Sequence, residues 1–166
     1  ALPILRPALA ALAGQPYPLP AEGGALRILV LGGSLGARIF ADVVPAAISA
    51  LPESLRARLL VTQQCRADDL ARTQSAYAAA AVPADLAPFF PDVAGKLATA
   101  HLVIGRAGAS TLAEIACAGR PAILVPLPSA IDDHQNANAR ALAAADAARV
   151  FAQAAFTPQA LTDALA

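Results

Sequence analysis

The stretch that decides the fold is residues 27–36, which read RILVLGGSLG. After Arg27, the next four residues form an apolar run, so that 27–31 is typical of a buried strand. The glycine-rich residues 32–36 follow it and lead directly into an Ala-rich stretch of helical length at 37–50. A strand, a glycine turn and a helix in this order are the first unit of a layered α/β fold.

The same alternation continues outward from this unit to the end of the chain. Short apolar runs are separated by stretches long enough for helices, and parallel strands need crossovers that are usually helical. Because the runs are apolar without alternation, both faces of the sheet should be covered, so we predict a doubly wound α/β domain with a parallel sheet. The expected strands are 27–31, 58–62, 86–90, 101–104, 122–125 and 148–151, and the expected helices are 37–50, 66–80, 92–100, 110–118, 134–145 and one from Pro158.

Residues 1–25 differ from the remainder of the chain. They hold five prolines and three glycines, a density that disfavours long regular structure and indicates a lead-in or linker. Residues 26–166 are long enough for one domain with helices on both faces of its sheet. Because the chain contains no Met, we expect an excised or processed fragment.

Composition narrows the possible classes of function. The hydrophobic fraction is 57%, yet it is mostly Ala, and every apolar run is interrupted before the roughly 20 residues that span a bilayer. With no secretion signal, a soluble cytoplasmic protein is expected. The net charge of +0 gives no electrostatic footprint for nucleic acid. Cys65 and Cys117 lie far apart without His or Cys at metal-ligand spacing, so we predict buried thiols. No carboxylate pair at metal-ligand spacing accompanies the glycine-rich residues 32–36, so we expect no metal, and we expect no cofactor.

The glycine-rich turn at 32–36 is the first candidate site. Its glycines let backbone N–H groups approach an anion, the following helix start adds partial positive charge, and Ser34 can donate a hydrogen bond, so we favour a phosphate loop. Three alternatives remain: a G-x-S-x-G hydrolase elbow, a dinucleotide fingerprint, and a turn that only packs. The elbow would need oxyanion-loop strands upstream of this first strand, and G-x-G-x-x-G is not matched.

A second small-residue loop, 105–111, follows the fourth expected strand. Arg106 can oppose a phosphate, and Ser110 or Thr111 can cap the next helix. Glu114 has two interpretations. It either closes a capping box and complements the helix dipole, or it accepts hydrogen bonds from a ribose diol.

The third loop, 126–138, is stiffened by prolines and feeds a helix for which Asp132 or Asp133 is the expected N-cap. His134, Gln135 and Asn138 cluster where this helix begins. Neutral groups of this kind suit the hydroxyls of a sugar, although such a cluster is also common on a solvated surface.

Taken together, the motifs GGSLGAR, GRAGASTLAEIACAGRPAILVP and DDHQNANA resemble the MurG family of GT-B glycosyltransferases, in its C-terminal donor domain, from about Arg27 to the end of the chain. The resemblance implies a Rossmann-like fold that forms one half of a GT-B enzyme. It also implies a role for each matching residue: a diphosphate at Gly33, Ser34 and Gly36; phosphates near Arg106, Ala109 and Thr111; a ribose diol at Glu114; uracil at the backbone of Phe90; N-acetylglucosamine at His134 and Gln135 with Asn138 nearby; and a donor contact at Arg6.

The resemblance further implies a reaction, an inverting transfer of N-acetylglucosamine from UDP-GlcNAc to the lipid I precursor of peptidoglycan, which forms lipid II. The family's acceptor domain is absent, so the fragment is expected to bind the donor without transferring sugar. The intact protein would be peripheral on the cytoplasmic face of the inner membrane. A stand-alone donor subunit that docks on a membrane partner is the alternative.

Overall fold

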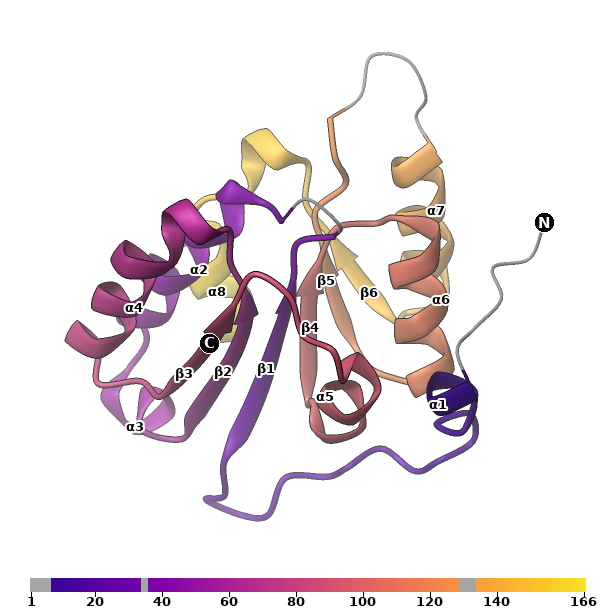
Figure 1. Cartoon of the computed structure of the whole chain (residues 1–166), viewed down its shortest axis with the longest axis horizontal. Helices are drawn as coiled ribbons and strands as arrows, with labels where there is room; N and C mark the ends of the chain where they lie inside the picture. The colour runs from indigo at the N-terminus through magenta and orange to yellow at the C-terminus, as the bar shows by residue number, and fades with distance from the viewer. Residues whose placement is uncertain (1–6, 34–35, 129–133) are drawn as a thin grey trace.

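A computed structural model describes residues 7–33, 36–128 and 134–166. Its centre is a six-stranded sheet in the order β3-β2-β1-β4-β5-β6, in which every neighbouring pair is parallel (Figure 1). The predicted doubly wound parallel sheet is therefore confirmed. The strands are β1 (Leu26–Leu31), β2 (Leu59–Gln64), β3 (Ala84–Ala87), β4 (Leu102–Gly105), β5 (Ala122–Leu124) and β6 (Ala148–Val150).

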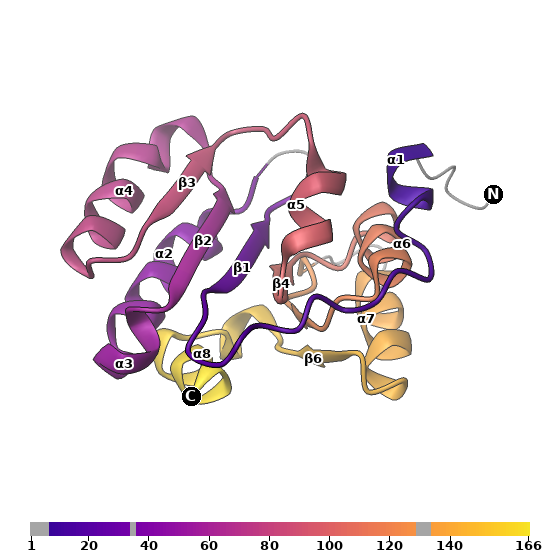
Figure 2. The same cartoon turned by 90° about the horizontal axis from the view of Figure 1, so that it is seen from below.

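Helices lie on both sides of this sheet (Figure 2). Alternate residues of β1 separate the two layers of core: Ile28 and Val30 belong to one buried cluster, and Leu29 and Leu31 to the other. The helices are α1 (Pro7–Ala10), α2 (Arg38–Ser49), α3 (Glu53–Arg56), α4 (Leu70–Ala79), α5 (Val93–Thr99), α6 (Ala109–Ala118), α7 (His134–Ala144) and α8 (Pro158–Leu165), with 3₁₀ turns at Ala67–Asp69 and Gln153–Ala155.

Local chemistry explains several helix ends. Asp92 caps α5 by accepting a hydrogen bond from Gly95 N at 2.8 Å. Thr157 caps α8 in the same way, with Pro158 at the first helical position. Gly119 ends α6 in the left-handed conformation, at φ +64°.

The third strand ends earlier than expected. We predicted 86–90, but β3 ends at Ala87, because Pro88 has no N–H with which to extend the ladder. Phe89 and Phe90 therefore lie in the loop beyond the strand. The short helices α1 and α3 and the two 3₁₀ turns were not expected, and the remaining helices and strands begin and end within four residues of the predicted ones.

The lead-in packs against the domain. In its described residues, 7–25, the single helix is the four-residue α1, and Leu9 and Leu12 are buried in the core cluster beside α6. Residues 13–25, which we call the strap, then run along the base of the sheet (Figure 2). The Tyr17 hydroxyl donates to His101 O at 2.9 Å, and Arg58 Nε donates to Gly24 O at 2.9 Å.

The two thiols differ in burial. Cys65 is buried as predicted, whereas Cys117 is partly exposed, so the prediction for Cys117 is wrong. It lies on α6, whose outer side is covered only in part by the short α1, and its Sγ lies 3.2 Å from Leu9 O. Within the ranges described above, no helix combines the length and the hydropathy needed to span a bilayer.

Candidate functional site

The candidate site lies at the carboxyl ends of the strands, where the strand order reverses. From β1 the chain moves first to β2 and β3 on one side, and then returns to β4 on the other side of β1. In open parallel sheets a ligand crevice forms at this switch point. Two adjoining hollows occupy it, of about 350 and 310 Å³, and Gly33 and Thr111 line both of them.

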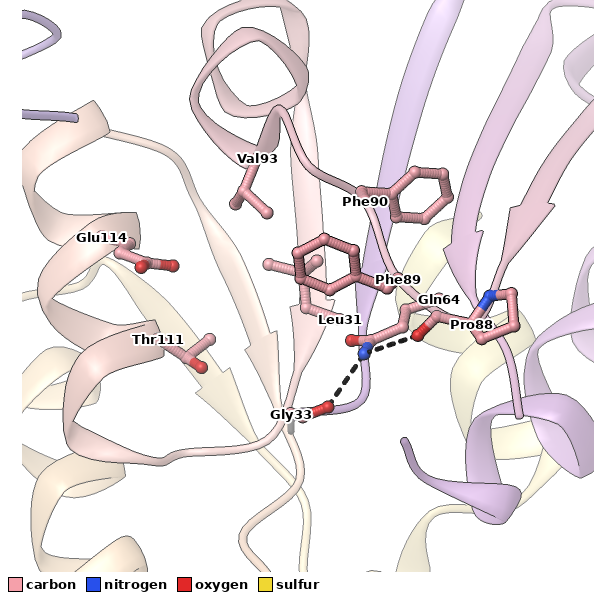
Figure 3. Close-up of a pocket in the computed structure, with 9 residues that line it drawn as sticks. All are labelled: Leu31, Gly33, Gln64, Pro88, Phe89, Phe90, Val93, Thr111 and Glu114. Carbon is pink, nitrogen blue, oxygen red and sulfur yellow. Dashed lines mark hydrogen bonds between the residues drawn. The ribbon is translucent and has the colours of Figure 1, made fainter. Parts of the chain in front are cut away.

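The first hollow is formed by loops from both halves of the sheet. Figure 3 shows Thr111 and Glu114 projecting from α6 on one side, and Phe89, Pro88 and Gln64 on the other. Its floor is apolar, because Leu31 ends β1 beneath it. A hollow with an apolar floor and a single carboxylate on one wall suits a flat ring joined to a hydroxyl-bearing group.

The second hollow lies over the glycine turn and the starts of two helices. Gly32, Gly33 and Gly36 form one wall, and residues of the other two loops complete it: Arg106, Gly108, Ser110, Thr111, Leu127 and Gln135. Backbone N–H groups and an arginine gathered at helix starts favour an anion.

Steric limits explain why the turn consists of glycines. A Cβ on Gly32 would lie 2.6 Å from Ala37 N, and Gly33 and Gly36 have φ values of +82° and +68°. Both φ values are costly for residues that carry a side chain. The prediction for Ser34 lies outside the described residues, as does that for Arg6.

Arg106 is held by backbone carbonyls at the rim of the second hollow. Its Nη1 donates to Val125 O at 3.1 Å and to Pro126 O at 3.4 Å, and the guanidinium lies 5.5 Å from the centre of the Phe40 ring. Burial lowers the pKa of Arg106. An arginine has five N–H donors and stays protonated, so the carbonyl bonds orient the group while Nε and Nη2 carry further donors.

The start of α6 corrects one prediction. The N-cap is Gly108, without a side-chain cap, so the expected capping by Ser110 or Thr111 is wrong: both lie inside the helix, where their side chains cannot reach the first N–H groups. Ala109 is the first helical residue and is exposed. Glu114 lies in the second turn, beyond the reach of a capping box, and lines the first hollow.

The loop after β3 presents two aromatic residues differently. Phe90 is 7% exposed, and Lys96 Nζ lies 5.1 Å from the centre of its ring, while Lys96 also pairs with Asp85 at 2.6 Å. Phe89 is 64% exposed. In Figure 3 the Phe90 ring points away from Glu114 and Thr111. Phe90 therefore lines the first hollow with its backbone rather than with its ring.

The start of α7 joins two of the loops. Gln135 Oε1 accepts from Ala107 N at 3.3 Å and from Leu127 N at 2.9 Å, and thereby ties the loop after β4 to the loop after β5. His134 is exposed at the first position of α7, and Asn138 is half-buried one turn later. Asp132 and Asp133, the predicted caps, lie outside the described residues.

Gln64 is a residue of the site that sequence reasoning missed. It ends β2, lines the first hollow, and makes hydrogen bonds to Gly32, Gly33 and Pro88. Its signal was available: Gln63 and Gln64 are polar residues at the end of an otherwise apolar strand, at the edge of the sheet where ligands bind.

Most of the predicted residues do come together. Seven of them line the two hollows: Gly33, Gly36, Phe90, Arg106, Thr111, Glu114 and Gln135. Ala109, His134 and Asn138 lie on the adjoining helices and do not line either hollow. Among the residues that the structure describes, no three His, Cys, Asp or Glu side chains gather as metal ligands.

This arrangement agrees with a comparison of the chain with known families. The glycosyltransferase family 28 C-terminal domain matches residues 27–166. The chain belongs to this family. The expected family resemblance is confirmed, since the family 28 match includes all three motif-bearing loops.

Relatives of this family 28 domain are closely similar over most of the chain. The UDP-N-acetylglucosamine–N-acetylmuramyl-(pentapeptide) pyrophosphoryl-undecaprenol N-acetylglucosamine transferase of Granulibacter bethesdensis is 60% identical over 157 residues, which are 95% of this chain and 41% of the relative. The transferase of the same name from Rhodospirillum centenum is 56% identical over 95% of this chain and 41% of its own length. The chain therefore spans about two fifths of these curated relatives.

A solved structure agrees with this assignment. The crystal structure of MurG from Acinetobacter baumannii superimposes with a TM-score of 0.78 at 39% identity, over 89% of this chain and 44% of that one. The glycosyltransferase of kitacinnamycin, at 21% identity and a TM-score of 0.64, shares the fold.

Proposed function

We propose that this chain is the donor-binding half of an inverting glycosyltransferase that uses UDP-N-acetylglucosamine. One observation carries the proposal. The two hollows meet at Thr111 and Gly33, with a carboxylate in the first and a glycine turn with an arginine in the second. A nucleoside diphosphate sugar presents its groups in the same order, namely base, ribose, diphosphate and sugar.

Each part of the donor has a matching group. The uracil would meet the backbone of Phe90, and the ribose diol would donate hydrogen bonds to the Glu114 carboxylate. The diphosphate would lie against the glycine turn and Thr111, at the N-terminus of α2. The sugar hydroxyls would form hydrogen bonds with Gln135, with His134 and Asn138 nearby. Arg6 would make a further contact with the UDP-GlcNAc donor.

The chemistry follows from that placement. An acceptor oxygen would attack the anomeric carbon from the face opposite the diphosphate, the bond from that carbon to the β-phosphate oxygen would break, and the acceptor would lose its proton to a base outside this domain. Charge would then grow on the β-phosphate. The backbone N–H groups of the turn, the dipole of α2 and Arg106 would stabilise that charge without a metal.

The names of the relatives suggest the wider reaction. We propose that the intact protein transfers N-acetylglucosamine to lipid I and forms lipid II for peptidoglycan, working as a peripheral protein on the cytoplasmic face of the inner membrane. The matching transferases are much longer than this chain, so the acceptor site would lie in the part of the protein that this chain does not contain.

Calorimetric titration of this chain with UDP-GlcNAc, in chelator, tests the proposal. We expect saturable binding of UDP-GlcNAc and of UDP, with weaker binding of a TDP-sugar. Glu114→Ala should weaken UDP-GlcNAc binding by tenfold or more, because two ribose hydroxyls lose a charged acceptor.

The matched control is Glu53→Ala, which removes an exposed carboxylate on α3 and should leave the affinity unchanged. A folded chain that does not bind UDP-GlcNAc would contradict the proposal. So would a Glu114→Ala variant that binds as tightly as the wild type, since the ribose contact would then lie elsewhere.

A further inference from the structure

Gln64 uses both ends of its side-chain amide. Its Oε1 accepts a hydrogen bond from Gly32 N at 3.1 Å, and its Nε2 donates to Gly33 O at 2.9 Å and to Pro88 O at 3.1 Å. Figure 3 shows the two hydrogen bonds from Nε2, one to Gly33 in the glycine turn and one to Pro88 in the loop after β3. One amide group thus connects the glycine turn with the loop that carries Phe90.

The sheet order explains why this residue can do so. Strand β2 lies between β1 and β3, and the glycine turn follows β1 while the Phe90 loop follows β3. Gln64 is the last residue of the middle strand, paired in register with Ala87 at the end of β3. Its side chain is therefore placed between the loops assigned to the diphosphate and to the base.

We propose that Gln64 is a positioning residue that holds the glycine turn and the Phe90 loop at the separation required by a single nucleoside diphosphate. The inference rests on the proposed function and adds a residue that acts through the loops on either side of it. Its role is to couple the base end and the phosphate end of the donor site.

The chemistry of the amide makes the residue hard to replace. The site needs an acceptor for one N–H group and a donor for two carbonyl groups, arranged on one planar group. Glutamate matches the shape but turns a carboxylate oxygen toward Gly33 O and Pro88 O. Leucine matches the length but forms no hydrogen bond, and asparagine is one methylene too short to reach both loops.

The test compares a whole ligand with its two parts. Uridine, inorganic pyrophosphate and UDP are titrated by NMR into the wild type, Gln64→Leu and Gln64→Glu, with Gln74→Leu as the control on the exposed face of α4. Linked parts bind better than separate parts only when their sites are held at the spacing of the linker. We expect Gln64→Leu to weaken UDP tenfold or more, while uridine and pyrophosphate each change by less than about threefold.

Gln64→Glu provides a second readout in case the leucine variant is unstable. It should weaken UDP and pyrophosphate strongly and uridine little, because the added negative charge lies beside the phosphate end. Thermal unfolding of each variant shows whether it is folded, and Gln74→Leu should match the wild type for all three ligands.

The outcomes separate the two claims. If the wild type binds UDP and Gln64→Leu binds it equally well, the positioning role is wrong while the proposed function stands. If Gln64→Leu loses uridine, pyrophosphate and UDP in equal proportion, the residue only supports the fold, and the inference is again overturned. If the folded wild type does not bind UDP, it is the proposed function that fails.

Discussion

At the scale of single residues, the glycines of the site are under different constraints. Gly32 has no room for a side chain, because a Cβ there would lie 2.6 Å from Ala37 N and 2.9 Å from Gly36. Gly108, at the start of α6, would place a Cβ with nothing within 4 Å, at an ordinary φ of −65°. The two glycines therefore differ sharply in the space available for a methyl group, and Gly108 is in addition the N-cap of α6.

Gly32→Ala is expected to lower the free energy of unfolding by about 1–3 kcal/mol, the usual cost of forcing a methyl group into packed surroundings. It should also weaken UDP binding, because Ala37 N and the start of α2 must move. Urea unfolding and UDP titration measure the two effects. Gly108→Ala should lower the unfolding free energy by less, about 0.5–1 kcal/mol, because alanine is a poorer N-cap than glycine, and equal losses in both variants would contradict this account.

At the scale of elements, a histidine at the base of the sheet connects strand β1, the start of β4 and the strap. His101, just before β4, accepts a hydrogen bond at Nδ1 from Arg27 N of β1 at 2.8 Å, and its carbonyl accepts one from the Tyr17 hydroxyl of the strap. Burial lowers the pKa of His101, and the nearby charge of Arg27 lowers it further. The fold therefore favours the neutral imidazole, the form whose Nδ1 can accept this hydrogen bond.

The sign of the pH dependence follows from that depressed pKa. The unfolded chain binds the proton more tightly, so the contribution of His101 to stability is fully present above the unfolded pKa of about 6.5. It is lost as the pH falls from there through the lower folded pKa. Stability measured by urea unfolding should thus decline as the pH falls below about 6.5.

His101→Gln supplies an acceptor that does not titrate, so this variant should show a flatter stability profile over that range. His134→Gln is the control, because His134 is the other histidine of the chain and lies on α7 at the opposite edge of the sheet. A profile that flattens in the control and not in His101→Gln would refute the assignment.

At the scale of the whole molecule, the two buried clusters lie on opposite faces of one sheet, and the candidate site lies at its carboxyl edge. The candidate binding groups there are backbone N–H groups, the Arg106 guanidinium, the Glu114 carboxylate and neutral amides. Under the proposed function these groups would neutralise a diphosphate with their own donors, and the described part of the site holds no carboxylate cluster for a bridging metal ion.

We therefore expect the affinity for UDP to be the same, within about twofold, in excess chelator and in excess magnesium. We also expect the chain to bind UDP-GlcNAc without releasing UDP when a lipid-linked acceptor is added, because under the proposed function the acceptor site and the base would lie outside this chain. Calorimetry and a coupled UDP assay test these points. A tenfold gain in affinity with magnesium, or steady UDP release, would show that the site works differently.

Much of this molecule was determined by its sequence alone. Apolar runs without alternation and helical stretches between them predicted a parallel sheet covered on both faces, because burial on two sides leaves no polar positions in a strand. The motif-bearing loops could be located as well. Each is a continuous segment at a strand end, and carboxyl ends of parallel strands share one edge, so the chemistry of Glu114 and the glycine turn could be assigned to one crevice.

Only the tertiary structure decided how those loops are held. Gln64 bonds to residues 31 and 24 positions away, Arg106 to carbonyls 19 and 20 positions away, and Gln135 to a residue 28 positions away. Such contacts depend on which strands are neighbours, which local propensity does not specify. The cap of α6 was missed because a segment rich in hydroxyl groups reads the same way whether it lies at the start of a helix or inside it. The end of β3 is a different case, because Pro88 marks it in the sequence and the prediction carried the strand past that proline.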